Sequence, residues 1–167
     1  MIVDIFNSIA TTKLDIVLNP SFWDSFNKDL FPITTSAWSE VKFLNDNLQL
    51  NEDLVSIPNN CGGIYAFVVK PEIIPKTHLY LMCIGRAQFT ETQNLRKRCK
   101  EYLSQKRPKI KRMIDTWGKY IYIRYLVLSD NTIIKKTEAA LINSILPPFN
   151  DEIPNKTIRD AVKAFRT

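Results

Sequence analysis

The spacing of apolar residues changes near residue 60, and it predicts two kinds of structure on either side. Before that point, apolar residues recur every three to four positions, which predicts an amphipathic helix over residues 36–48. The stripe consists of Trp38, Val41, Leu44 and Leu48, after a capping Ser36. Residues 1–60 are therefore expected to be a mostly helical extension that packs on the main domain. A glycine-rich turn at 59–63 marks the start of the second unit.

After the turn, runs rich in β-branched and aromatic residues alternate with helical periodicity. The expected elements are strands over 64–69 and 79–84, helices over 92–105 and 109–116, a strand over 120–128, a helix ending at 146 and a short helix over 157–165. Gly85 is expected to close the second strand. This order predicts an α/β protein of the α+β type, with a three-stranded sheet flanked by helices. The domains expected are 1–60, 61–151 and a C-terminal helical segment, 152–167.

Composition narrows the class of protein. A chain of 167 residues with 45% hydrophobic residues suits one compact domain with an extension. No run approaches the roughly 18 to 20 apolar residues of a membrane span, so no membrane partner is expected. The start of the chain does not resemble a secretion signal, and the three cysteines have no metal-site spacing. Reduced thiols and a cytoplasmic location are expected.

Charge is distributed unevenly. Residues 1–60 carry a net charge of −5, and residues 61–167 carry +11. Eleven basic residues fall between Arg96 and Arg124, against two acidic ones. Such a cluster is a plausible footprint for nucleic acid, and a solvated basic face explains the charge equally well. The candidate nucleic-acid-binding residues are Lys97, Lys100, Lys106, Arg107, Lys109, Lys111 and Arg112.

Glu138 is a lone carboxylate on the apolar side of the helix that ends at 146. Three apolar residues share its helix face, namely Leu141, Ile142 and Ile145. A carboxylate near such a stripe is costly to bury unless something pairs with it or binds to it. An arginine of the same chain and a bound cation are both possible partners.

Other polar residues stand at strand ends or share a helix face. Tyr65 lies beside the glycine turn, and Arg86 follows the second strand. Arg98 and Tyr102 are four residues apart and project from one face of a helix. Each has an ordinary structural explanation as well, because strand tyrosines usually belong to the core and arginines in a basic run usually face solvent.

These residues, in this order, resemble the GIY-YIG nuclease domain. The motifs are Gly63-Ile64-Tyr65, Cys83-Ile84-Gly85, Asn94 to Arg98, Glu138 and Pro148-Phe149-Asn150. The resemblance covers residues 61–151 and implies a small fold with a three-stranded antiparallel sheet. It also implies cleavage of phosphodiester bonds in DNA with one divalent metal ion, Mg²⁺ or Mn²⁺, with RNA not excluded.

The resemblance further assigns roles to residues. Glu138 is implied as the metal ligand, and Arg98 as the residue that holds phosphate oxygens. Tyr65 is implied to activate or orient the attacking water, which requires nearby positive charge because a phenol is a poor base at pH 7. Arg86 could supply that charge or contact phosphate. Asn150 would anchor the site, and Tyr102 stands where relatives carry histidine or tyrosine.

One position departs from the family pattern. The second motif usually begins with tyrosine, and Cys83 stands there instead. A thiol cannot reproduce the reach of a phenol. Tyr80 is three residues earlier, so strand alternation places it on the opposite face. Cys83 has no histidine partner nearby in sequence, which argues against a cysteine hydrolase.

Three functions are compatible with these patterns. The first is a metal-dependent endonuclease. The second is a weakened or inactive nucleic-acid-binding module on the same fold. The third is a regulatory protein whose acidic residues 1–60 cover the basic site or recruit a partner.

Overall fold

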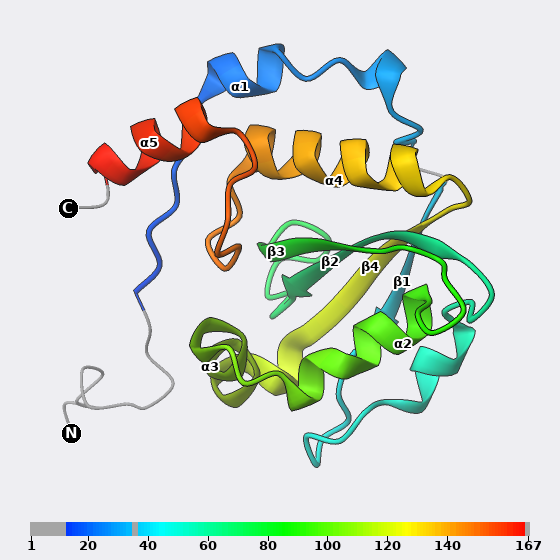
Figure 1. The fold of residues 1–167 in the computed structure, drawn as a ribbon. Helices are drawn as coiled ribbons and strands as arrows, with labels where there is room; N and C mark the ends of the chain where they lie inside the picture. The colour runs from blue at the N-terminus through cyan, green and yellow to red at the C-terminus, as the bar shows by residue number, and fades with distance from the viewer. Residues whose placement is uncertain (1–12, 35–36, 166–167) are drawn as a thin grey trace, which may run out of the picture.

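An antiparallel sheet with helices on both faces forms the centre of the molecule (Figure 1). The computed structural model describes residues 13–34 and 37–165. Four strands pair in the order β1-β4-β2-β3. The strands are β1 Trp38–Lys42, β2 Gly62–Val69, β3 Tyr80–Ala87 and β4 Ile121–Leu128. The α-helices are α1 Pro20–Asp24, α2 Leu95–Lys100, α3 Pro108–Trp117, α4 Asn131–Ile145 and α5 Lys156–Phe165, and the 3-10 helices are η2 Lys28–Leu30, η4 Glu52–Ser56, η5 Glu101–Ser104 and η6 Gly118–Tyr120.

Most of the expected elements after residue 60 are present, and two of them differ from the expected bounds by three residues or more at one end. β3 continues through Gly85 to Ala87, so the expectation that Gly85 ends the strand is wrong. Gly85 pairs with Tyr65 on β2, and a side chain there would collide with the Tyr65 ring. The expected helix over 92–105 begins only at Leu95, where the Asn94 side chain accepts a hydrogen bond from the Lys97 amide at 2.9 Å. Its second half is the tighter helix η5.

The expectation of a helix over 36–48 is wrong, because part of this segment is a strand. The sheet therefore has four strands and not the three expected. Trp38–Lys42 is a strand that pairs with β4. A spacing of three places Trp38 and Val41 on opposite faces of a strand, and each packs in a different core. Both faces of this sheet are covered, so a spacing typical of a helix also satisfies a strand. The expected cap, Ser36, lies outside the described residues.

The two faces of the sheet bury separate apolar clusters. α4 covers one face, and Ile64 and Ala66 of β2 pack there against Leu141 and Ile142. α2, η5 and α3 cover the other face, where Tyr65 and other side chains of β2 are buried (Figure 1). Consecutive residues of β2 thus face different helices. β3 is the edge strand beside β2, so groups from both layers can meet around it.

A bulge in the β2–β3 pair overturns the expectation for Tyr80. The register shifts between Phe67 and Val68, so Cys83 stands opposite Phe67, and Tyr80 stands opposite Val69. Directly paired residues point to the same face, and both Phe67 and Val69 belong to the cluster beneath α2. Tyr80 therefore lies on the face of Cys83, not on the opposite one. Its hydroxyl instead lies 3.1 Å from Nε2 of His78, outside the pocket described below.

The described part of the N-terminal extension contains little helix before β1. α1 and η2 are short, and the rest of residues 13–34 is irregular. Val17 and Phe22 pack with Leu146, Ile153 and Val162, near α4 and α5 (Figure 1). Among the described helices, none has the length and apolar character needed to cross a bilayer.

Candidate active site

A pocket of about 590 Å³ lies at the edge strand β3, and it brings together the catalytic candidates of the sequence. Six of its lining residues are the predicted catalytic set, Tyr65, Arg86, Arg98, Tyr102, Glu138 and Asn150. β2 and β3 supply Tyr65 and Arg86, and α4 supplies Glu138. Arg98 and Tyr102 come from the helical segment on the other face. Residues more than 80 positions apart therefore meet around one strand.

Tyr65 and Tyr102 form a buried pair of phenols on the α2 side. The Tyr65 hydroxyl donates to the Tyr102 hydroxyl at 3.1 Å, and Tyr65 is only 1% exposed. Tyr102 also stacks on Phe67, with 4.4 Å between ring centroids. Both rings therefore have little freedom to turn, and their hydroxyl groups stay at the pocket.

The environment of Tyr65 opposes the expected lowering of its pKa. Burial raises the pKa of Tyr65 well above its usual value, Tyr102 raises it further, and the Arg98 guanidinium opposes both. Burial also raises the pKa of Tyr102. The positive charge near Tyr65 comes from Arg98 and not from Arg86, and it does not outweigh burial. At neutral pH, Tyr65 is a phenol that can orient a water molecule, not a phenolate that takes its proton.

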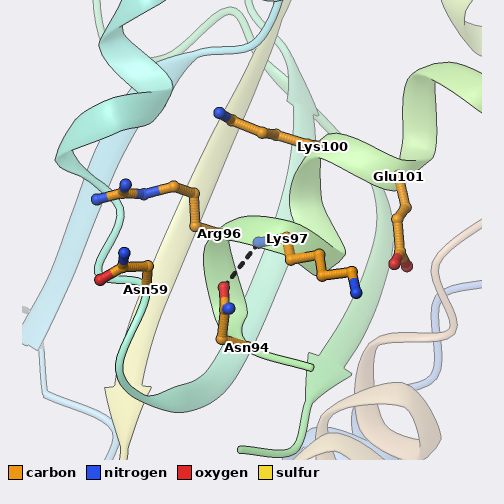
Figure 2. A pocket seen from close by; sticks show the side chains of 6 residues that line it. All are labelled: Asn59, Asn94, Arg96, Lys97, Lys100 and Glu101. Carbon is orange, nitrogen blue, oxygen red and sulfur yellow. Dashed lines mark hydrogen bonds between the residues drawn. The ribbon is translucent and has the colours of Figure 1, made fainter. Parts of the chain in front are cut away.

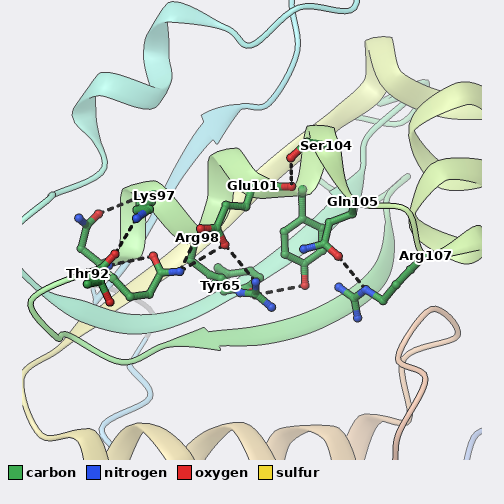
Figure 3. A network of polar contacts seen from close by, with 11 residues as sticks. Tyr65, Thr92, Lys97, Arg98, Glu101, Ser104, Gln105 and Arg107 are labelled. Carbon is green, nitrogen blue, oxygen red and sulfur yellow. Dashed lines mark hydrogen bonds and ion pairs between the residues drawn. The ribbon is translucent and has the colours of Figure 1, made fainter.

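Arg98 is held over the aromatic pair from the side of α2. Its Nη1 lies 3.1 Å from Oε2 of Glu101, and its Cζ lies 5.7 Å from the centroid of Tyr102. The Arg98 and Glu101 side chains are each about one-third exposed. Figure 3 shows Arg98 beside Tyr65 in this network of polar contacts. Arg98 is thus oriented by its neighbours while part of its side chain stays accessible from the pocket.

Glu138 meets Arg86 across the gap between α4 and β3. A guanidinium nitrogen of Arg86 donates to Oε2 of Glu138, whose side chain is 13% exposed. Burial raises the pKa of Glu138, and this outweighs the opposing effects of Arg86 and Arg98. The carboxylate is therefore only partly compensated by the protein. A cation at its other oxygen would favour the ionised form.

Asn150 ties the segment after α4 to the edge strand. Its Oδ1 accepts from the Ile84 amide at 2.9 Å, and its Nδ2 donates to the Ile84 carbonyl at 2.8 Å. The Phe149 amide also donates to the Met82 carbonyl at 2.9 Å. A side-chain amide matches a peptide group in both directions, so asparagine suits this position. Asn150 holds β3 and the end of α4 together at the pocket.

Cys83 lines the pocket and is expected to be unreactive. It is 2% exposed, and burial raises its pKa to about 12. A thiol with this pKa is not ionised at neutral pH and is a poor nucleophile. This agrees with the argument against a cysteine hydrolase.

The predicted nucleic-acid-binding residues divide among different surfaces. Lys97 and Lys100 line a second pocket with Arg96, Asn59 and Asn94 (Figure 2). In that pocket Arg96 donates to the carbonyls of Val55 and Ile57, and Lys97 donates to the carbonyl of Thr92. Lys106, Lys109, Lys111 and Arg112 lie on α3 and the loop before it. Arg107 alone of the seven lines the candidate active site.

Gly85 and Arg107 also line the pocket, although the sequence did not predict them as catalytic residues. The missing side chain of Gly85 leaves room for the Tyr65 ring, whereas the local sequence predicts the end of a strand there. Arg107 belongs to the basic run, and nothing in the local sequence distinguishes it from its neighbours. Among the described residues, none before Tyr65 lines the pocket, so residues 13–34 and 37–60 do not cover it.

The donor set of the pocket fits a magnesium-like ion held by few protein ligands. Among the described residues there is no cluster of three or more histidine, cysteine, aspartate or glutamate side chains that could hold a metal. Glu138 offers one partly compensated carboxylate in a pocket large enough for water. Mg²⁺ is commonly bound through one or two carboxylates and keeps several waters, so Glu138 is a suitable ligand for it.

Comparison with known proteins finds similarity only among solved structures. No family model matches the sequence, and no curated protein matches it. Three similar structures are point mutants of the GIY-YIG N-terminal endonuclease domain of UvrC from Thermotoga maritima, each bound to its catalytic divalent cation. Identities are 18–20%, with 64–65% of this chain and 99–100% of those chains covered, and TM-scores are 0.45–0.46. Function must therefore be argued from the site of this chain.

Proposed function

We propose that this chain is a metal-dependent endonuclease that hydrolyses phosphodiester bonds in DNA. The observation that carries the proposal is the convergence of Tyr65, Arg98, Glu138 and Asn150, predicted from motif resemblance, on one pocket at β3. A chance resemblance in four separate segments would have no reason to produce this convergence. The basic residues of α2, α3 and the loop between them would attract the phosphate backbone without reading its sequence.

Each residue contributes a distinct part of the chemistry. Arg98 offers guanidinium donors to phosphate oxygens, on which negative charge grows during attack. Tyr65, as a neutral phenol hydrogen-bonded to Tyr102, orients the attacking water. Glu138 holds the divalent ion, Mg²⁺ or Mn²⁺, which when bound polarises the phosphate and stabilises the leaving oxygen. Asn150 is a positioning residue, because it touches β3 and no reacting group.

A cleavage assay with matched acidic variants tests the proposal. Duplex, nicked, branched and single-stranded DNA, together with RNA, are incubated with purified protein and Mg²⁺ or Mn²⁺. We expect Glu138→Gln and Arg98→Ala to lower cleavage at least about a hundredfold, the scale of losing a transition-state contact. Glu152→Gln serves as the control, since it removes an exposed carboxylate from the same pocket. A wild type that cuts none of these substrates, or Glu138→Gln that cuts at the wild-type rate, would refute the endonuclease.

Two observations favour a second function, a nucleic-acid-binding module without catalysis. The Arg86–Glu138 ion pair gives the carboxylate a partner within the protein, and Cys83 takes the place of a phenol. In that case DNA binding would be salt-sensitive, and Glu138→Gln would not alter it. Mn²⁺ binding followed by electron paramagnetic resonance separates the two functions: the endonuclease requires binding that is lost in Glu138→Gln, whereas the binding module requires none.

A further inference from the structure

Arg107 carries a buried hydrogen-bond donor, Nη2, that has no partner in the described protein. The other nitrogens are only partly engaged. Nε donates to Oε1 of Gln105 at 3.1 Å, whereas Nη1 lies 3.7 Å from Oδ2 of Asp151, beyond a normal hydrogen bond. Buried donors nearly always have an acceptor. The guanidinium of Arg107 therefore keeps hydrogen-bonding capacity that the described residues leave unused.

Arg107 is placed where that acceptor would belong to a ligand of the pocket. It lines the same pocket as Tyr65 and Arg98. The Cζ atoms of Arg107 and Arg98 lie 5.5 and 5.7 Å from the centroid of the Tyr102 ring. Figure 3 shows Arg107 reaching back toward Gln105 from the loop before α3. Two guanidinium groups thus converge around the ring that positions the Tyr65 hydroxyl.

The protein's own acids do not neutralise Arg107 well. Asp151 is its nearest carboxylate, but the Arg107 and Asp151 side chains are each 41% exposed. Asp151 is also shared with Lys109, whose Nζ lies 3.4 Å from Oδ1. Cys83, which lines the same pocket, is a buried thiol and supplies no carboxylate. An anionic ligand with several oxygens would accept from the exposed part of the Arg107 guanidinium and add a partner for its charge.

We propose that Arg107 is a second phosphate-binding arginine of this pocket, with its guanidinium donating to a non-bridging oxygen of a nucleic-acid phosphodiester. This inference rests on the proposed function for the identity of the ligand. A guanidinium offers a planar fork of donors that matches phosphate oxygens. Arg98 and Arg107 then hold the phosphate from the two sides of Tyr102.

Binding of a fluorescently labelled DNA duplex, measured by anisotropy with the full chain in chelator, tests the role of Arg107 without cleavage. We expect Arg107→Gln to weaken binding by about tenfold, the effect of one charged hydrogen bond. Lys119→Gln removes one exposed charge outside the pocket, and it should change Kd by less than about threefold. Arg107→Lys keeps the charge without the fork and should recover only part of the affinity.

Further arms exclude indirect effects. Asp151→Asn removes the carboxylate that Arg107 shares with Lys109, so an Arg107→Gln loss that disappears in the Asp151→Asn background would assign the effect to Asp151 and overturn the inference. Thermal unfolding checks that Arg107→Gln is folded. If it is not, Arg107→Lys decides, and wild-type affinity in that variant would contradict binding through the guanidinium donors. Excess inorganic phosphate at constant ionic strength should not displace the duplex. Displacement that is lost in Arg107→Gln would mean that Arg107 binds a free anion and not a phosphodiester.

The outcomes separate this inference from the proposed activity. A wild type that binds the duplex but cuts no nucleic acid refutes the endonuclease and leaves Arg107 as a phosphate ligand if Arg107→Gln binds more weakly. Arg107→Gln that binds as tightly as Lys119→Gln overturns the inference and leaves the endonuclease standing. A wild type that binds no duplex overturns the inference, and the cleavage assay on the other substrates then decides the endonuclease.

Discussion

Gly85 stands directly opposite Tyr65 in the antiparallel β2–β3 pair, and the absence of a side chain at Gly85 leaves the space that the Tyr65 ring occupies. The ring can therefore lie across the edge strand and place its hydroxyl beside Tyr102. A close approach of this kind, and not a turn, explains the glycine of the second motif.

Replacing Gly85 with alanine should displace the Tyr65 ring. Because the added carbon would overlap the ring, we expect Gly85→Ala to lower the free energy of unfolding by about 1 to 3 kcal/mol. In a Tyr65→Ala background the ring is absent, so Gly85→Ala should cost much less. Urea denaturation of the four proteins in this double-mutant cycle measures the coupling. Additive losses would contradict the proposed overlap.

Tyr65 should make the protein sensitive to alkaline pH. Its pKa in the folded state is raised by burial above the unfolded value of about 10. The stability that the neutral phenol contributes is present below pH 10 and lost as pH rises through the folded pKa. In thermal unfolding between pH 8 and 11, the Tm of Tyr65→Phe should therefore fall less than that of wild type. Tyr120→Phe, at an exposed position, should follow wild type.

Asn150 should be required for the integrity of the edge strand. Asn150→Ala leaves the Ile84 peptide group without its side-chain partner, and we expect a loss of about 2 kcal/mol in unfolding free energy. Asn150→Asp should be worse at pH 7, since an oxygen replaces the donor that faces the Ile84 carbonyl. Hydrogen exchange at the Ile84 amide reports the effect locally. Asn143→Ala, which removes one exposed hydrogen bond to Asn155, is the control; equal losses in both would contradict a special role for Asn150.

Glu40 should link β1 to the sheet in a pH-dependent way. Burial alone would raise its pKa, but hydrogen bonds from Lys70 and Arg124 outweigh burial and lower it. Stability from Glu40 is therefore present above the unfolded pKa of about 4.3 and lost as pH falls through the folded pKa. Glu40→Gln should cost about 1 kcal/mol at pH 7 and less at pH 3, measured by urea denaturation.

A neighbouring acid provides the comparison for Glu40. Glu72 also approaches Lys70, at 3.5 Å, but its side chain is more exposed. Glu72→Gln should stay within about 0.5 kcal/mol of wild type at both pH values. A loss for Glu40→Gln that is equally large at pH 3 would mean that the charge of Glu40 is not what stabilises β1.

The spacing of apolar residues predicted helices and strands correctly wherever it fitted only one periodicity. β2 and β4 are runs of β-branched and aromatic residues, and α4 and α5 carry clear apolar stripes, so their types could be predicted. β1 could not, because the spacing of Trp38 and Val41 suits either a helix or a strand buried on both faces. The segment is a strand because it pairs with the otherwise free edge of β4. That edge exists only once the sheet has formed.

The register of the β2–β3 pair could not be predicted from the sequence either. The bulge between Phe67 and Val68 puts Tyr80 on the face of Cys83, although alternation along an ideal strand would separate them. An extra residue in one strand leaves no mark in the apolar pattern when both faces are buried. The importance of Gly85 for Tyr65 and of Arg107 for the pocket likewise depends on side chains that approach from other elements.

By itself, the sequence determined which residue types were available and the order of the motifs, because these are properties of short segments. It therefore identified Tyr65, Arg98, Glu138 and Asn150 as candidates. Only the tertiary structure decided that they line one pocket, that Glu138 meets Arg86, and that the pKa of Tyr65 is raised rather than lowered. Distances and desolvation depend on residues far apart in the chain, and they acquire values only when the sheet and its two helical layers are assembled.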